Sequence, residues 1–195
     1  AVIDTLIAEG LPVAKREVVK NKGYGHGLLV GLEHCRGRFV GFTCADGQVD
    51  ASDVVRLYEA AASGKTSRLT KVRRRFRMDG LKRKVVSVFY NLAANLMFGG
   101  LGSLDVNGNP KIFPREYLTR MELQSEDWFL DAEVMLKAKR LRLPVFEMNV
   151  MAQMRGQGVS HVRLGTVFEF LRNFWRWRQG RVPDIVPKRR AIGLP

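Results

Sequence analysis

The sequence predicts an α/β fold in which helices cover the faces of one sheet. Short apolar runs alternate along the chain with longer segments of helical periodicity, which is the pattern of layered α/β domains. One apolar run, residues 38–43, leads directly into the polar turn Cys44-Ala45-Asp46-Gly47-Gln48. With 195 residues and 46% hydrophobic content, the chain is large enough for one core and marginal for two. We therefore expect one domain over residues 1–162 and a basic extension over 163–195.

The first half of the chain predicts three helices and three strands. Gly10 and Pro12 end the first helix, and Gly23 belongs to a turn before the second. Asp50 or Ser52 can cap the third helix at its N-terminus. The expected elements are a helix over 1–10, a strand over 16–20, a helix over 25–35, a strand over 38–43, a helix over 53–62 and a strand over 67–73.

The second half continues the alternation. Residues 81–98 are strongly helical and gather Val85, Val88, Phe89, Leu92 and Leu96 on one face. The other expected elements are a strand over 111–113, a helix over 127–141, a strand over 144–151 and a helix over 163–178. The helix over 127–141 would place Asp127 and Asp131 one turn apart on the same face.

Charge and cysteine content narrow the functional classes. The formal net charge of +14 favours anionic partners such as phosphorylated substrates, acidic lipids or nucleic acid. The basic residues concentrate in 71–84 and after Arg155, whereas 121–133 is acidic, so the chain is not basic throughout. A nucleic-acid-binding module remains an alternative, although no motif of that class is present. Cys35 and Cys44 form neither a disulfide framework nor a zinc pattern.

The turn after the strand 38–43 is the strongest chemical signal in the chain. The carboxyl ends of strands open onto the binding crevice in α/β proteins. Asp46 and Gln48 carry oxygen ligands that suit Mg²⁺ or Mn²⁺ bound to a diphosphate. The alternative is an acidic turn that only caps the next helix.

The neighbours of this turn, taken in order, resemble the family-2 glycosyltransferases, and most closely the dolichyl-phosphate-mannose-synthase-like enzymes that glycosylate a polyprenyl phosphate. The resemblance covers residues 16–165. The matching stretches are Asn21-x-Gly23-x-Gly25, Gly37 to Gln48, Arg73 to Ser87, Asp105 to Phe113, Asp127 to Glu133, and Glu147 to Ser160. No single stretch is specific, but their order and spacing together are.

The resemblance implies a GT-A fold, Rossmann-like and incomplete at its N-terminus, because the family's opening strand is missing. It implies inverting, metal-dependent transfer of a sugar from a UDP- or GDP-sugar to a polyprenyl phosphate at the cytoplasmic face of a membrane, with no specific nucleic acid. Asp46 would hold Mg²⁺ or Mn²⁺ with support from Gln48. Asp127 or Asp131 would be the base for a hydroxyl acceptor. The expected donor or phosphate contacts are Arg73, Arg77, Arg83, Ser87, Arg155 and Ser160.

Two features leave alternatives open. Cys44 stands where the family has its first aspartate, and a neutral thiol is a poor ligand for a hard cation. A catalytically impaired protein that binds a partner through this fold is therefore possible. The helix over 163–178 combines aromatic residues with arginines, as interfacial membrane helices do. The other interpretation is that this helix packs on the protein's own core.

Overall fold

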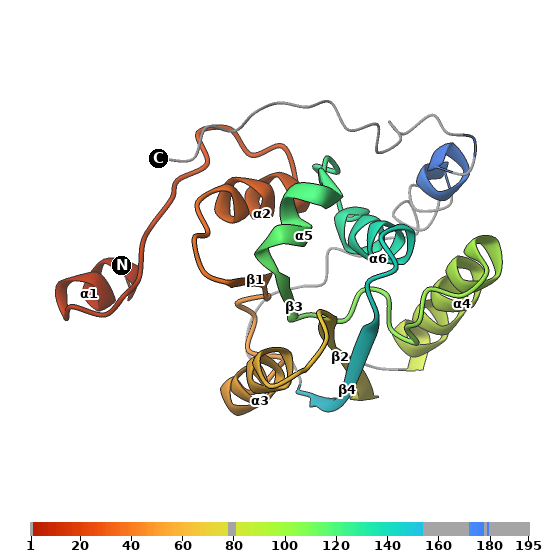
Figure 1. The fold of residues 1–195 in the computed structure, drawn as a ribbon, viewed down its shortest axis with the longest axis horizontal. Coiled ribbons are helices and arrows are strands. Elements are labelled where there is room, and N and C mark those ends of the chain that lie inside the picture. The colour runs from red at the N-terminus through yellow and green to blue at the C-terminus, as the bar shows by residue number, and fades with distance from the viewer. Residues whose placement is uncertain (1, 78–80, 154–171, 178, 180–195) are drawn as a thin grey trace.

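The computed structural model describes residues 2–77, 81–153, 172–177 and 179 (Figure 1). The helices are α1 (Val2–Ala8), α2 (Tyr24–Glu33), α3 (Ala51–Ala62), α4 (Leu81–Phe98), α5 (Arg115–Met121) and α6 (Leu130–Arg140). The strands are β1 (Phe39–Phe42), β2 (Leu69–Arg77), β3 (Lys111–Pro114) and β4 (Val145–Ala152). Residues 172–177 are also helical.

The four strands form one mixed sheet in the order β1-β3-β2-β4. β3 runs antiparallel to β1 and to β2, and β2 and β4 are parallel. Strands β1, β2 and β4 therefore point in the same direction and end at the same edge of the sheet. This edge is where an α/β protein gathers its functional loops.

Helices cover both faces of the sheet (Figure 1). On one face, Leu57 and Ala61 of α3 pack with Val72, Ile112 and Val150 from the strands. On the other face, Val40 and Phe42 of β1 and Phe113 of β3 pack with α2, α5 and α6. The alternation of side chains along each strand supplies both cores.

Most expected elements are confirmed with shifts of a few residues at their ends, but two expectations are wrong. Residues 16–20 form no strand; Val19 is fully exposed and the segment has no strand beside it to complete a ladder. Helix α6 begins at Leu130, so Asp127 precedes it and does not share a helical face with Asp131. Helix α5 was not expected.

Helix α4 forms where it was expected but with its apolar face turned outward. Val88, Phe89, Leu92 and Leu96 are exposed by 58%, 67%, 52% and 74%. Its inner side carries Ala94 and Asn91, and Tyr90, Met97 and Phe98 pack against the core. Figure 1 shows α4 at the right-hand edge of the molecule, with one flank against the body.

The described part of the last expected helix packs on the protein's own core. Phe174 is fully buried and contacts the rings of Tyr90, Phe98 and Phe129. Trp177 is buried under the cations of Lys137 and Arg140. Of the two interpretations of the helix over 163–178, the described part favours packing on the protein's own core, because the Phe174 ring fills the space between α4 and α6. Residues 163–171 lie outside the described part of the chain, and no described helix is long and apolar enough to span a bilayer.

Candidate active site

The Cys44–Gln48 turn lies at the edge where β1, β2 and β4 end. Its last residue is fastened to the end of β4: the Gln153 N–H donates to the Gln48 carbonyl at 3.0 Å, and Gln48 Nε2 donates to the Gln153 carbonyl at 3.3 Å. Gln48 is buried as a result. The turn is thereby held between two strands that are not neighbours in the sheet.

Within the turn, Asp46 is half-buried and its Oδ1 accepts the Gln48 N–H at 3.2 Å. Asp50 has a different role, because its carboxylate accepts the Ser52 N–H at 2.8 Å and caps α3. The acidic turn therefore divides its carboxylates between a helix cap at Asp50 and a position facing the site at Asp46.

The glycines before α2 let that helix touch the segment that precedes α6. A Cβ at Gly23 would lie 2.5 Å from the Glu126 carbonyl oxygen, and one at Gly25 would lie 2.2 Å from that of Ser125. The Asn21 side chain accepts the Gly23 N–H at 2.9 Å and shapes the approach. The Asn21-x-Gly23-x-Gly25 motif therefore brings the first turn of α2 to the site edge.

Tyr24, between these glycines, connects α2 to the turn. Its ring stacks on Trp128 with centroids 4.4 Å apart, and its hydroxyl accepts from Asn109 Nδ2 at 3.0 Å. The same hydroxyl lies 4.0 Å from Cys44 Sγ. Burial and the nearby Asp131 carboxylate raise the pKa of Tyr24, which stays a neutral phenol.

Beneath Tyr24 lies a buried ion pair between Lys111 Nζ and the Asp131 carboxylate. Asn109 donates to Asp131 at 3.3 Å and accepts from Lys111 at 3.1 Å. Burial lowers the pKa of Lys111 and the Asp131 charge opposes that shift. Asp131 therefore sits inside the protein with its oxygens directed at Lys111 and Asn109, where it joins β3 to α6.

Arg74 is the arginine that the fold brings to this edge. Its Nε and Nη2 both donate to the Asp105 carboxylate at 2.9 Å. Burial opposes the charge on Arg74, but Asp105, with smaller contributions from Asp131 and Cys44, raises its pKa above the ordinary value. Arg74 stays cationic at all working pH values.

A second buried lysine, Lys71, lies beside this pair. Lys71 Nζ donates to Glu147 at 2.9 Å and to the Asp105 carbonyl. Burial and the neighbouring Lys111 charge lower the pKa of Lys71 to about 8, against the opposing pull of Asp105 and Glu147. Burial alone would raise the pKa of Glu147, but Lys71 and Ser103 lower it below its usual range.

The Cys44 thiol lies in a region of negative electrostatic potential. Burial, then the carboxylates of Asp131 and Asp46, raise its pKa above the ordinary value. The neutral thiol is thereby stabilised, and it is the form that binds a hard cation least well.

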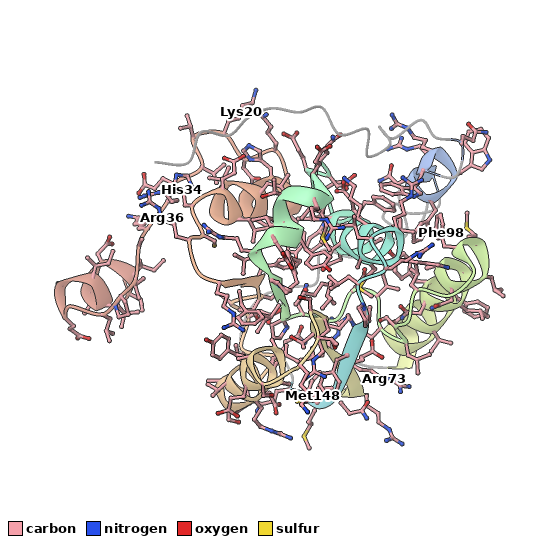
Figure 2. All side chains as sticks on the ribbon, in the orientation of Figure 1. Lys20, His34, Arg36, Arg73, Phe98 and Met148 are labelled. Carbon is pink, nitrogen blue, oxygen red and sulfur yellow. The ribbon has the colours of Figure 1, made fainter. Side chains whose placement is uncertain are left out.

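The structure places the remaining predicted residues as follows. Asp127 is half-buried, accepts the Phe129 N–H at 2.9 Å through Oδ1, and accepts Asn173 Nδ2 at 3.0 Å through Oδ2. Ser87 accepts from Asn91 Nδ2 within α4. Arg73 follows the opposite face of β2 from Arg74, and Figure 2 shows it with Met148 at the lower edge of the molecule.

The other predicted phosphate contacts cannot be placed. Arg155 and Ser160 lie outside the described residues, and so do the side chains of Arg77 and Arg83. Of the predicted set, the fold brings Asp46, Gln48 and Asp131 to one edge of the sheet, with Asp127 just before α6.

The described residues contain no cluster of three or more His, Cys, Asp or Glu side chains arranged to hold a metal. Asp46 carries a carboxylate, which would be a hard ligand for the predicted ion. Gln48, fastened to Gln153, supports Asp46 by fixing the turn.

Sequence reasoning did not single out Tyr24, Arg74, Asn109 or Lys111. All lay within the stretches used for the family resemblance, so the signal was present. Periodicity could not separate Arg74 from Arg73, since the strand register decides which of two adjacent arginines faces the site.

Comparison with solved structures shows the fold. The chain superposes on glucosyl-3-phosphoglycerate synthase from Mycobacterium tuberculosis in complex with UDP with a TM-score of 0.66 and 21% identity, covering 92% of this chain and 64% of that one. A complex of that enzyme with Mn²⁺ and UDP-glucose gives a TM-score of 0.66 and 22% identity over 92% of this chain and 64% of that one. A complex with Mn²⁺, UDP and glucosyl-3-phosphoglycerate gives 0.64 and 21% with the same coverage.

The chain has a GT-A glycosyltransferase fold. It spans about 64% of the length of these neighbours. No protein-family model matches the sequence, and no curated protein matches it.

Proposed function

We propose that this chain is the catalytic part of a glycosyltransferase that moves a sugar, with inversion, from a nucleotide-diphosphate donor to a phosphate-bearing acceptor. The observation that carries the proposal is the position of Asp46 in a turn at the carboxyl edge of a GT-A sheet, where the neighbouring Cys44 interacts electrostatically with Arg74. The structural neighbours, complexed with UDP, Mn²⁺ and UDP-glucose, support a UDP- or GDP-sugar donor and Mg²⁺ or Mn²⁺.

The described side chains fit such a transfer. Asp46 would hold the divalent ion, which when bound neutralises the charge that develops on the leaving diphosphate. Arg74, with one edge of its guanidinium paired to Asp105, adds a fixed positive charge at the same edge of the sheet. Tyr24 and Trp128 together form an aromatic surface beside Cys44, against which a sugar or base can pack.

The acceptor we propose is a polyprenyl phosphate. A phosphate is already ionised at neutral pH and attacks without a strong general base, whereas a hydroxyl needs one. Asp131 is buried against Lys111 and Asn109, so it is not placed to receive a proton from an acceptor. Asp127 is the remaining base for a hydroxyl acceptor. The neighbouring structures hold phosphoglyceric acid, which is also a phosphate-bearing acceptor, although a water-soluble one.

Cys44 favours a second candidate, a catalytically impaired protein that keeps the fold to bind a partner. The thiol removes one hard ligand from the turn, and its raised pKa keeps it neutral. Donor turnover by the unaltered protein separates the two candidates.

The test is metal-dependent turnover of UDP- and GDP-sugars by the full-length protein, with a polyprenyl phosphate or 3-phosphoglycerate as acceptor. We expect Asp46→Asn to lower turnover by about a hundredfold or more, since the leaving diphosphate would lose its neutralising ion. Asp50→Asn is the matched control: it lies in the same segment, and asparagine caps α3 as well as aspartate does.

Equal turnover for wild type and Asp46→Asn would overturn the metal-ligand assignment. Product from 3-phosphoglycerate alone would replace the lipid acceptor with a soluble one. Absence of turnover in wild type, with retained binding of a partner protein, would favour the impaired candidate.

A further inference from the structure

The outer face of α4 is a continuous apolar surface. Val88, Phe89, Leu92 and Leu96 follow one another at spacings of one, three and four residues, so they share one side of the helix. Each is more than half exposed. Single exposed apolar residues are common in proteins, but a row of four along one helix marks a contact surface.

Two asparagines on the inner side of α4 help to specify this orientation. Asn91 Oδ1 accepts the Val106 N–H at 2.7 Å. Asn95 accepts the Leu101 N–H at 2.8 Å and donates to the Ser103 carbonyl at 3.0 Å. These backbone groups lie in a largely buried loop, where each needs a partner. These hydrogen bonds, together with the packing of Tyr90 and Phe98 on Phe174, hold this side of α4 against the protein. The four exposed apolar residues are therefore left on the outer side of the helix.

The charge around this face is positive. No Asp or Glu occurs between Leu81 and Leu104, and the first turn of α4 reads Leu81-Lys82-Arg83-Lys84. An apolar helix face joined to a basic segment is the composition of helices that lie on anionic membranes.

We propose that the outer face of α4 docks on an anionic lipid surface. A second copy of the chain fits less well, because pairing the same face across a two-fold axis would bring two basic segments together in molecules of net charge +14 each. An anionic membrane attracts this charge and receives the four apolar side chains.

The inner side of α4 is linked to the candidate active site. Asn91 holds Val106, and the preceding residue, Asp105, holds Arg74 at that site. The functional reason for membrane docking rests on the proposed lipid-phosphate acceptor. Vesicle binding itself is measured separately from sugar transfer.

The test is co-sedimentation of the full-length protein with vesicles of phosphatidylcholine alone or mixed with phosphatidylglycerol. We expect binding to the mixed vesicles only, and a loss of roughly tenfold or more in the double variant Phe89→Gln/Leu92→Gln. Val55→Gln, at an exposed apolar position on α3, is the matched control and should bind as wild type does. Thermal melting of each variant checks that the fold is intact, since exposed substitutions change stability little.

Equal vesicle binding by the double variant and wild type would overturn the proposal, because charge alone would then explain binding. The proposal would also be overturned if wild type did not bind vesicles but formed a dimer, and the double variant were a monomer. In that case a second copy of the chain would occupy the outer face of α4. Donor turnover, measured without vesicles, should be the same in the double variant and wild type. If neither wild type nor the double variant turned over the donor, the proposed function would be refuted. The vesicle experiment would still decide whether α4 docks on lipid.

Discussion

At the residue scale, the turn carries a thiol at Cys44, two residues before the proposed metal ligand Asp46. Its sulfur lies 4.0 Å from the Tyr24 hydroxyl and close to the carboxylates of Asp46 and Asp131, which raise its pKa. The same surroundings would suit a metal-bound carboxylate, since the ion would supply the missing positive charge. We therefore propose that the residue at position 44 affects the affinity of the turn for a divalent ion.

We expect Cys44→Asp to raise the affinity for Mn²⁺ by about tenfold or more, because it adds a second hard ligand beside Asp46. Cys44→Ser is the control, because it keeps the size of the side chain without adding a charge. Calorimetric titration with Mn²⁺ in the presence of UDP measures the effect. Identical affinities for the aspartate and serine variants would show that position 44 does not face the ion.

At the scale of elements, the contact between α2 and the segment before α6 depends on glycine. The first turn of α2 lies so close to Ser125 and Glu126 that no side chain fits at Gly25. The His26 N–H donates to the Glu126 carbonyl at 2.9 Å and joins the two segments. Tyr24 and Trp128 stack only because this approach is possible.

We expect Gly25→Ala to destabilise the protein by about 1–3 kcal/mol, since the new Cβ would meet only backbone atoms, which cannot rotate away. Gly27→Ala, on the same helix with nothing within 4 Å, should instead be neutral or stabilise by about 0.5–1 kcal/mol. Urea denaturation of both variants provides the comparison. Equal stabilities would mean that α2 does not approach this segment.

The elements also show what periodicity can and cannot predict. The apolar runs predicted β1 to β4 and the apolar spacing predicted α4, because those signals are local. The sequence did not predict that the apolar face of α4 points outward. That orientation depends on backbone N–H groups of the 101–106 loop, which donate hydrogen bonds to Asn91 and Asn95. The site was predicted as a turn with Asp46 and Gln48, but its network with Tyr24, Asn109 and Lys111 comes from strand register and was not.

At the scale of the whole molecule, three lysines among the described residues are almost fully buried in ion pairs: Lys71 with Glu147, Lys111 with Asp131, and Lys137 with Glu133. Removing a charge from water costs several kcal/mol, and a partner offsets this only in part. Glu133 also accepts the N–H groups of Gln124 and Ser125, which holds the loop before α6. These pairs join the strands and α6 into one unit whose stability depends on pH.

Lys71 gives this dependence a defined sign. Its pKa is lowered from 10.5 to about 8 in the folded protein, so between these values the unfolded chain binds a proton that the folded one has released. Stability due to this group therefore rises with pH across that window. We therefore expect the unfolding free energy to increase more with pH in wild type than in Lys71→Met, by on the order of 3 kcal/mol between pH 8 and pH 10.5.

Denaturant unfolding of both proteins at several pH values measures this difference. The contributions of Cys44 and Tyr24, whose pKa values are raised, lower stability at high pH in both proteins and largely cancel in the difference. Parallel pH profiles for wild type and Lys71→Met would show that Lys71 keeps its ordinary pKa in the folded state.

The outward apolar face of α4 also affects how the protein behaves at high concentration. Two such faces attract each other, and the net charge of +14 is the long-range force that keeps the molecules apart. Added salt screens that charge while leaving the apolar attraction in place or strengthening it. The colloidal stability of the protein is therefore greatest in dilute buffers, and crystals grown from concentrated salt would bring the α4 faces into lattice contact.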